Sequence, residues 1–375
     1  MKICFFNSVK KWGGGEKWHL NVATAFFKAG HDVVIASCPE SELEKKAKAA
    51  GIKTNTFNLS NLSFLNPFKQ ISILEFFRKE KFDVVIFNFS RDLKSGALCA
   101  KLAGIPKIIY RRGLDTAIKD NFVNRIIFKD CLTDVLANSE ATKDSILKNN
   151  PNLFPREKIK VIYNGINIDT DNLSAVAHPA FTEATVDKTA KADIPIVGNL
   201  GRCVYQKGQD ILLDVAAILK NRGVKCKFII GGDGPLLKKL KEQSKSSGID
   251  DMVEFVGFVE NPNRFMPGID IFALTSRFEG FGYVIAEAMV HNIPVVAFNI
   301  SSNPELVSDG KNGLLVPFEN KELFARALID LINNKEKRKQ FGDNGKKIVL
   351  EKFNFEKNVR KVMEYISNSY TRQNG

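Results

Sequence analysis

The chain has 375 residues, of which 44% are hydrophobic and 26% charged, an ordinary composition for a globular protein of about two domains. No stretch reaches the roughly 18 consecutive apolar residues that a membrane-spanning helix needs, and the apolar run before Lys10 is too short for a signal peptide. The six cysteines are scattered without a CxxC pair, which argues against a zinc site or a disulfide framework and indicates free thiols in a reducing cytoplasm.

The net charge of +13 is concentrated in the N-terminal half. Residues 1–170 contain 27 lysines and arginines against 17 acidic residues, a net charge of +10, whereas residues 171–375 contribute only +3. A basic half is typical of proteins that meet phosphates, such as nucleic acid, anionic lipid or phosphorylated substrates. It is also typical of a solubilising surface, and on the charge alone we prefer that interpretation.

Apolar runs of strand length alternate with helical segments along the N-terminal part of the chain. The strands expected there are 2–9, 31–37, 82–88, 106–111 and 134–139, and the helices are 17–30, 41–51, 97–104 and 140–149. This alternation predicts a parallel sheet that is covered by helices on both faces.

The alternation lapses at residues 171–192, a polar and aperiodic stretch containing Pro179, which we interpret as a linker. It then resumes, with strands expected at 194–202, 226–234, 253–258, 269–276 and 293–299 and helices at 208–223, 235–248 and 282–290. We therefore predict an α/β protein of two doubly wound, Rossmann-like domains, residues 1–172 and 193–354, that face each other across a cleft. We expect an amphipathic helix at about 355–372 to pack back on the N-terminal domain.

Two loops that follow strands are suited to phosphate. Gly13, Gly14 and Gly15 precede the first long helix, where backbone N–H groups can approach an anion. Arg202 and Lys207 follow the first strand of the second half, and an arginine fork beside a lysine point charge suits a diphosphate. The glycine run is equally compatible with a flexible turn, and two such cations alone are more often exposed loop residues.

Two glutamates stand in the otherwise apolar stretch 276–289. Glu279 precedes a bend at Gly280–Gly282, and Glu287 lies about two turns further along the helix that follows. Glu279 and the free N–H groups at the start of this helix can face a ligand in the bend. The same spacing is also compatible with two glutamates that have no function in common.

The segment EGFGYVIAEAM, residues 279–289, resembles the E-x7-E motif of the retaining glycosyltransferases of family 4, which have the glycosyltransferase B fold. Further segments stand in the order of that family's motifs: GGGE, ANSEATKDSI, VIYNGIN, GRCVYQKG, IIGGDGP, VEFVGF and VSDGKNGLLV. The resemblance covers nearly the whole chain and is specific as a set.

The resemblance implies a metal-independent, front-face transfer of a sugar from a UDP- or GDP-linked donor, with retention of configuration, to a glycan, lipid-linked, lipopolysaccharide or capsule-type acceptor. The implied catalytic residues are Arg202 and Lys207, which hold the donor diphosphate, and Glu279, which holds the donor sugar. The implied donor-binding residues are Gly13, Gly14, Gly15, Gly232, Asp233, Val256, Phe258, Gly280, Phe281, Gly282 and Glu287, the last on the nucleotide ribose. The C-terminal domain is thus implied to bind the donor and the N-terminal domain the acceptor, with no cofactor besides the nucleotide-sugar substrate.

The chain departs from that family on the acceptor side. Many relatives have a histidine after the fourth or fifth strand of the first domain, whereas this chain has Arg111 and Arg112 there. The four histidines lie elsewhere, at His19, His31, His178 and His291. Two arginines suit an acceptor that carries phosphate or carboxylate.

No metal site is expected. The one DxD spacing, Asp169 and Asp171, falls at the start of the linker, and we interpret it as a solvated pair. Arg202, Lys207 and a helix N-terminus can neutralise a leaving diphosphate without a metal ion.

The residues alone leave other functions open. A sugar-phosphate synthase with a soluble phosphorylated acceptor, or a catalytically silent sugar-nucleotide-binding subunit, would share the predicted fold. An epimerase would require catalytic histidines that this chain lacks, and a glycosidase would hold the scissile bond between two carboxylates. Nucleic-acid binding rests on charge alone and is not expected.

We expect a cytoplasmic protein that attaches peripherally to the inner face of a membrane. Residues 64–81 and 118–130 both mix aromatic and aliphatic residues with lysine and arginine, as helices at an anionic membrane surface do. Packing of the same aromatic residues in the core is the equally weighted alternative.

Overall fold

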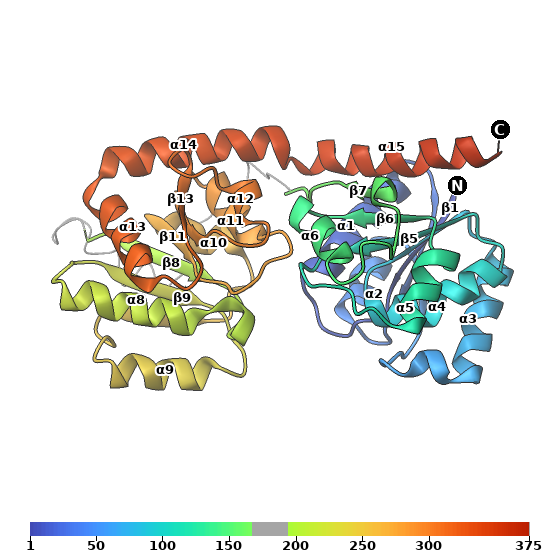
Figure 1. Ribbon diagram of the computed structural model, residues 1–375, viewed down its shortest axis with the longest axis horizontal. Coiled ribbons are helices and arrows are strands. Elements are labelled where there is room, and N and C mark those ends of the chain that lie inside the picture. Colours follow the sequence, from blue (N-terminus) through green and yellow to red (C-terminus); the bar gives the residue numbers. More distant parts are fainter. Residues whose placement is uncertain (167–193, 375) are drawn as a thin grey trace. The chain divides into compact units, whose positions relative to one another are not determined.

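The computed structural model describes residues 1–166 and 194–374 (Figure 1). The chain divides into two compact units. One, called here the N-terminal unit, is Met1–Gly165 together with Glu356–Gly375, and the other, the C-terminal unit, is Ile166–Phe355. The expected linker at 171–192, His178 and the Asp169–Asp171 pair lie outside the described residues.

The N-terminal unit is built on a seven-stranded sheet in the order β3-β2-β1-β4-β5-β6-β7, in which all the pairings are parallel. Its strands are β1 Lys2–Asn7, β2 Asp32–Ser37, β3 Lys53–Thr56, β4 Val84–Phe87, β5 Lys107–Arg112, β6 Asp134–Ala137 and β7 Ile159–Val161. Its α-helices are α1 Gly14–Lys28, α2 Glu42–Ala49, α3 Pro67–Glu80, α4 Ser90–Leu102, α5 Phe122–Ile126, α6 Glu140–Leu147 and α15 Phe355–Asn374. Single turns lie at η1 Ser63–Leu65, η2 Ile127–Cys131 and η3 Arg156–Lys158.

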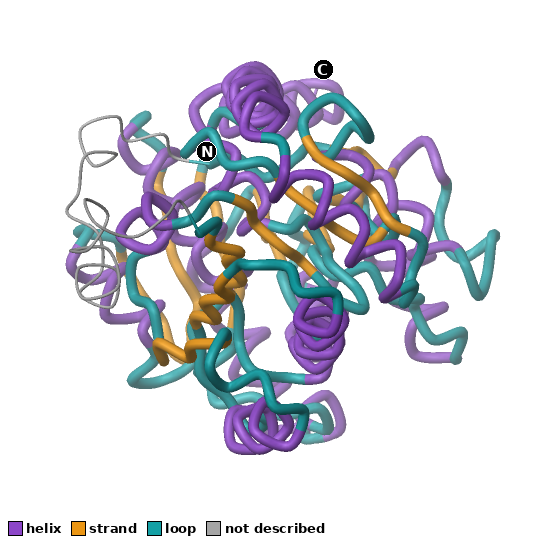
Figure 2. The backbone as a smooth tube through the Cα atoms, turned by 90° about the vertical axis from the view of Figure 1, so that its left-hand side faces the viewer, coloured by secondary structure: helices purple, strands orange, loops and turns teal. Residues whose placement is uncertain are grey.

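The C-terminal unit repeats this plan with six parallel strands in the order β10-β9-β8-β11-β12-β13. Its strands are β8 Ile196–Leu200, β9 Lys227–Gly231, β10 Val253–Gly257, β11 Ile271–Leu274, β12 Val295–Phe298 and β13 Gly313–Val316. Its α-helices are α8 Gln209–Asn221, α9 Leu237–Ser246, α10 Pro262–Phe265, α11 Tyr283–Val290, α12 Asn303–Leu306, α13 Lys321–Asn333 and α14 Lys335–Lys352. Single 3-10 turns lie at η5 Tyr205–Lys207 and η6 Met266–Gly268, and helices flank the strands of this sheet (Figure 2).

The central strands form because their sequences are apolar on both faces. Every residue of β4 is buried, and β1 is buried from Ile3 onward, as expected for a parallel sheet between two layers of helices. Phe6 shows how the core is filled, since its ring packs within about 6 Å of the rings of Phe57, Phe77 and Phe87. The prediction of two Rossmann-like α/β sheets is therefore confirmed.

Both sheets have a point at which the strand order reverses. In the N-terminal unit it lies between β1 and β4, and in the C-terminal unit between β8 and β11. Loops that leave the carboxyl ends of such neighbouring strands run in opposite directions and leave room for a ligand. Each sheet therefore marks one edge at which functional residues are expected.

The C-terminal helix α15 is anchored to the N-terminal unit. The Tyr365 hydroxyl donates to the Asp134 carboxylate on β6 at 2.6 Å, and the ammonium of the buried Lys107 lies 4.7 Å from the centre of the Tyr365 ring. The same ammonium lies 3.5 Å from Asp134. A lysine, a carboxylate and a phenol thus meet where the helix packs on the sheet, although the buried Lys107 ammonium makes no hydrogen bond there.

All six cysteines are free and buried. In the described part of the chain, no helix combines the length and the apolar character that crossing a membrane requires.

Candidate active site

Lys207 and Glu279 meet at the carboxyl edge of the C-terminal sheet. The Lys207 ammonium lies 2.6 Å from Oε1 of Glu279, and the Ser276 hydroxyl donates to the same oxygen at 2.6 Å. Lys207 ends the turn η5 after β8, and Glu279 lies in the loop after β11, so the contact joins the two loops at the reversal point. Both side chains are largely buried, at 16% and 6% exposure.

Two glycines allow these loops to approach each other. Gly208 has a φ of +61°, and a Cβ there would lie 2.0 Å from the carbonyl oxygen of Thr275. Gly232 has a φ of +139°, and its Cβ would lie 1.9 Å from the carbonyl oxygen of Gly201. Any other residue would both strain the backbone and push the loops apart. The backbone around Lys207 is therefore fixed by close contact.

Arg202 follows β8 and is exposed beside this contact. The Gln209 amide donates to the carbonyl oxygens of Gly201 and Arg202, both at 3.2 Å, which fixes the loop while the guanidinium stays at the surface. Asp233 lies in the neighbouring loop after β9, where its carbonyl accepts from the Cys203 N–H at 2.9 Å. The two predicted cations are thus in one loop system, with Arg202 exposed at the surface and Lys207 bound to a carboxylate.

The bend before α11 contains the predicted sugar-binding segment. Phe281 is buried against the rings of Tyr283 and Phe353, and Gly282 takes a left-handed conformation with a φ of +77° just before the helix. No side chain caps this helix, and the N–H of Ile285 donates to the Gly282 carbonyl at 2.9 Å, so the positive end of the helix dipole faces the bend. Glu287 is half-buried, four residues into the helix.

Val256 and Phe258 lie at the carboxyl end of β10, which neighbours β9 at the edge of the same sheet. Val256 is half-buried, whereas Phe258 is 75% exposed. The N–H of Gly232 donates to the Gly257 carbonyl at 2.6 Å, so this end of β10 is tied to the glycine loop after β9. The predicted donor residues of the C-terminal unit therefore share one sheet edge.

The N-terminal unit has a pocket of about 370 Å³ at its own reversal point. Gly15, at the start of α1, lines it together with Arg91 on α4 and with Arg111 and Arg112 at the end of β5. Gly13 and Gly14, which directly precede Gly15 in the sequence, are exposed. The structure thus brings the predicted glycine loop and the predicted arginine pair together, although they are almost a hundred residues apart in the sequence.

Both arginines of the pair are buried and held mostly by uncharged groups. Arg111 donates to the side-chain oxygens of Asn88 at 3.2 Å and Asn164 at 2.8 Å, and its guanidinium lies 4.8 Å from the centre of the Trp18 ring. Arg112 donates to the Tyr110 hydroxyl at 3.0 Å, to Ser90 at 3.5 Å and to both oxygens of Thr116.

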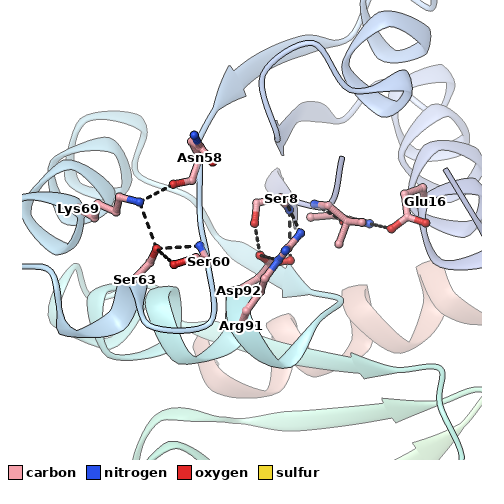
Figure 3. A network of polar contacts seen from close by, with 10 residues as sticks. Ser8, Glu16, Asn58, Ser60, Ser63, Lys69, Arg91 and Asp92 are labelled. Carbon is pink, nitrogen blue, oxygen red and sulfur yellow. Dashed lines mark hydrogen bonds and ion pairs between the residues drawn. The ribbon is translucent and has the colours of Figure 1, made fainter. Parts of the chain in front are cut away.

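The structure also places polar residues near this pocket that the sequence did not single out (Figure 3). The buried Asp92 accepts from the Ser8 hydroxyl and from the Ser8 N–H at 3.2 Å, and Arg91 donates to the Ser8 carbonyl at 2.7 Å. Burial raises the pKa of the Asp92 carboxyl to about 7. Burial likewise raises the pKa of Glu16, which accepts from Asn7 at 3.2 Å. Ser8 and Asp92 are 84 residues apart, and no local pattern connects them.

His19 is part of the core of the N-terminal unit. It is fully buried, and its ring lies edge-on to Phe5 and near Trp18. Burial lowers the pKa of this imidazole well below its ordinary value, so it is neutral near pH 7. Burial also lowers the pKa of His291, to about 4, and Nε2 of this ring contacts the Asn263 side-chain oxygen at 3.2 Å.

Two family models match the chain in succession. The one described as Glycosyltransferase Family 4 matches residues 12–170, and the one described as Glycosyl transferases group 1 matches residues 181–348. An uncharacterized glycosyltransferase of Methanocaldococcus jannaschii is 31% identical to this chain over 281 residues, 72% of each protein. The chain belongs to the glycosyltransferases.

Further relatives cover nearly all of this glycosyltransferase. The capsular polysaccharide biosynthesis glycosyltransferase CapM of Staphylococcus aureus is 26% identical over 347 residues, 87% of each chain. HepE of Anabaena, solved in complex with UDP-glucose, has 25% identity and a TM-score of 0.82 over 98% of this chain and 100% of its own. The fold and the transferase class thus agree with the resemblance seen in the motifs.

Proposed function

We propose that this glycosyltransferase moves a sugar from a nucleotide-diphosphate sugar to an acceptor of polysaccharide, lipopolysaccharide or lipid-linked type, with retention of configuration. The contact of Lys207 with Glu279 carries the proposal. It places a cation and a hydrogen-bonding carboxylate side by side at the reversal point of the C-terminal sheet, where an α/β fold binds its ligand.

In this proposal Arg202 and Lys207 hold the donor diphosphate. Negative charge grows on the leaving phosphate as the glycosidic bond breaks, and two fixed cations stabilise it more in the transition state than in the ground state. The uncapped start of α11 adds N–H groups at the same edge. These groups supply the positive charge that a metal ion supplies in other transferases, so we propose transfer without a metal ion.

Glu279 and the backbone of Gly280–Gly282 hold the donor sugar in this proposal. Oε1 of Glu279 already accepts from an ammonium and a hydroxyl, which is the chemistry of binding sugar hydroxyls. Glu287, about two turns away on α11, is assigned to the ribose. The exposed Phe258 and its neighbour Val256 are assigned to the base, and Gly232 and Asp233 to the adjoining donor loop.

We propose that the two glutamates bind two parts of one donor, the sugar and the ribose, and do not form an acid–base pair. Both stand on one segment, within nine residues, and reach the same sheet edge, whereas an acid–base pair would bracket the reacting bond. The departing phosphate then helps to deprotonate the acceptor on the same face of the sugar, which gives retention. The acceptor is assigned to the pocket of the N-terminal unit, with Arg111 and Arg112, whereas the Gly13–Gly15 loop is assigned to the donor phosphates.

The named relatives support a UDP-linked donor and a surface-polysaccharide acceptor. HepE was solved with UDP-glucose, and CapM is named for capsular polysaccharide biosynthesis.

The test is donor hydrolysis without acceptor across a panel of sugar nucleotides, with and without EDTA. We expect slow hydrolysis of one nucleotide sugar that EDTA leaves unchanged. Complete loss with EDTA would overturn the metal-independent mechanism, and binding without hydrolysis or transfer would indicate a catalytically silent subunit.

A further inference from the structure

The pocket of the N-terminal unit is a strongly basic cavity. Three of its lining residues are arginines, Arg91, Arg111 and Arg112, and none of the described residues that line it is acidic. Of the nearby carboxylates, Glu16 accepts from Asn7, whereas Asp92 accepts from Ser8 and also lies 3.9 Å from Nε of Arg91. The pocket therefore presents positive charge that no lining carboxylate neutralises.

Two arginines of this pocket, Arg112 and Arg91, have hydrogen-bonding capacity to spare. Arg112 is only 6% exposed, yet all the partners of its terminal nitrogens are uncharged oxygens and its buried Nε–H has no partner. Arg91 donates to a backbone carbonyl, and its Nε–H makes no hydrogen bond, although it lies 3.9 Å from Oδ1 of Asp92. Helix α4 begins at Ser90 on the pocket wall without a side-chain cap. Guanidinium groups and free helix N–H groups together favour an oxyanion such as phosphate.

An apolar ridge begins at the rim of the pocket. Asn61 lines the pocket, and four residues that follow it are largely exposed: Leu62 at 69%, Leu65 at 68%, Phe68 at 80% and Ile71 at 52%. We call these four residues the apolar ridge. They occupy η1, its flanks and the first turns of α3. Exposed apolar residues that gather in this way mark an interaction surface.

Polar side chains hold the ridge in this outward position (Figure 3). The Ser63 hydroxyl accepts from the Ser60 N–H at 2.8 Å, and the Lys69 ammonium binds the Asn58 carbonyl at 2.7 Å and the Ser63 hydroxyl at 3.2 Å. Asn66 caps α3 by accepting from the Lys69 N–H at 3.1 Å. The loop therefore buries Ser63 and exposes Leu62 and Leu65, the reverse of the usual order at a water-facing surface.

The surroundings of the ridge are apolar and basic. Helix α3 packs against α4, which exposes Leu98 and Leu102 at 49% and 58% (Figure 1). Exposed cations also lie on these two helices and directly after α3. They are Arg78, Lys79, Lys81 and Lys101. Of the acidic residues of α3, Glu80 is bound by Lys2 and Lys53, which leaves Glu75 as its exposed acid. Apolar side chains among basic ones match the interface of an anionic bilayer.

We propose that the N-terminal unit takes a membrane-resident acceptor whose phosphate lies in the arginine pocket and whose lipid part extends along the apolar ridge into an anionic bilayer. This inference rests on the proposed function in one respect, because only a sugar transferase would use the bound molecule as its acceptor. The ridge adjoins the pocket through Asn61 and Leu62, so a phosphate in the pocket and a chain on the ridge belong to one amphiphile. The ridge residues enter the lipid interface as the phosphate binds.

The ridge is tested by flotation with vesicles of phosphatidylcholine alone or mixed with phosphatidylglycerol. The unchanged protein should float with the mixed vesicles, and the double variant L65S/F68S should bind them about tenfold or more weakly. The matched control L323S/L350S removes two exposed leucines of the C-terminal unit and should bind as the unchanged protein does. Equal binding by both double variants, or no binding by the unchanged protein, would overturn the ridge assignment.

The pocket is tested with dodecyl phosphate in phosphatidylcholine vesicles and with glycerol phosphate in solution. Asn61→Asp adds a carboxylate at the exposed rim and Arg91→Gln removes a cation, and both should weaken binding of dodecyl phosphate vesicles about tenfold. The exposed Asn152→Asp, which is in the same unit but not in the pocket wall, is the control. Undiminished binding by both pocket variants would overturn the proposal. Glycerol phosphate bound as tightly as dodecyl phosphate would replace the lipid by a soluble phosphorylated acceptor.

Donor hydrolysis separates this inference from the proposed function. The ridge double variant should hydrolyse the nucleotide sugar as fast as the unchanged protein, because the donor residues of the C-terminal unit are intact. Vesicle binding with no hydrolysis by any protein would contradict the proposed function alone, whereas hydrolysis with no effect of the ridge or pocket variants would contradict the inference alone.

Discussion

Lys207 contacts the carboxylate of Glu279, and the next residue, Gly208, fixes the backbone by its close approach to Thr275. In the proposed reaction its ammonium binds the leaving phosphate, whose charge grows as the bond breaks. Lys207→Ala should therefore lower kcat by about a hundredfold or more and change donor affinity much less. Steady-state kinetics measure this split, and a variant with normal kcat but weakened KM would contradict the role.

Glu287 should behave in the opposite way. The ribose is held alike before and during transfer, so Glu287→Ala should weaken nucleotide binding by about tenfold or more while kcat falls little. Calorimetric titration with the nucleotide diphosphate measures the affinity directly. Unchanged affinity with lost turnover would place Glu287 at the reacting atoms.

Asp92 predicts a pH dependence of stability. Burial raises the pKa of its carboxyl from 3.8 to about 7, so in this range the folded protein keeps a proton that the unfolded chain releases. The free energy of unfolding should thus fall as pH rises from about 4 to about 7, by up to roughly 4 kcal/mol for this group, and then level off. Asp92→Asn imitates the protonated carboxyl and should lack this slope. Urea unfolding of both proteins across this range checks it, and parallel curves would refute it.

At the scale of elements, the start of α8 depends on glycine. Gly208 and Gly223 have similar φ values, +61° and +69°, but a Cβ at Gly208 would lie 2.0 Å from the Thr275 carbonyl, whereas nothing lies within 4 Å of one at Gly223. Gly223→Ala should cost about 1 kcal/mol of stability, and Gly208→Ala at least about 2 kcal/mol more, because the loops must also separate. Urea unfolding compares the two variants, and equal costs would show that the close approach is absent in solution.

The elements that the sequence predicted are those with a strong local signal. The strand at 2–9 was predicted because β1 is a continuous apolar run, and the helix at 282–290 because of its glycine bend and its apolar face. Strand β3, Lys53–Thr56, was missed because its sequence, KTNT, is polar and suits an edge strand. The predicted start of the first helix, residue 17, is three residues late, since α1 begins at Gly14 within the glycine run.

The site was predictable only as far as its motifs are local. Glu279, the glycine bend and Arg202 stand in recognisable segments, and the alternation predicts parallel strands whose carboxyl ends share one edge, but the strand order was not predicted. The Ser276 contact with Glu279 and the Ser8 contact with Asp92 depend on side-chain packing, which no spacing encodes. Segment 64–81 was predicted either to meet a membrane or to pack in the core. Ile73 and Phe77 are buried in the core while Phe68 and Ile71 are exposed, so contact of the segment with a membrane stays a prediction.

At the scale of the whole molecule, the chemistry is divided between two units. The C-terminal unit contains the Lys207–Glu279 contact, and the N-terminal unit contains the arginine pocket, the apolar ridge and most of the net positive charge. The chain begins in the N-terminal unit and returns to it through α15, which Tyr365 fixes to β6. This division fits a reaction in which a nucleotide sugar and a membrane acceptor are held by different domains.

The central claim is transfer with retention, and the anomeric configuration of the first product tests it most directly. A donor such as UDP-glucose, whose sugar is α-linked, can be incubated with the enzyme and followed by proton NMR before mutarotation, so that water serves as the acceptor. We expect the first sugar released to be the α-anomer, and we expect Lys207→Ala to slow its release. A β-anomer as the first product would contradict retention. It would also contradict the assignment of Glu279 and Glu287 to binding the sugar and the ribose of one donor.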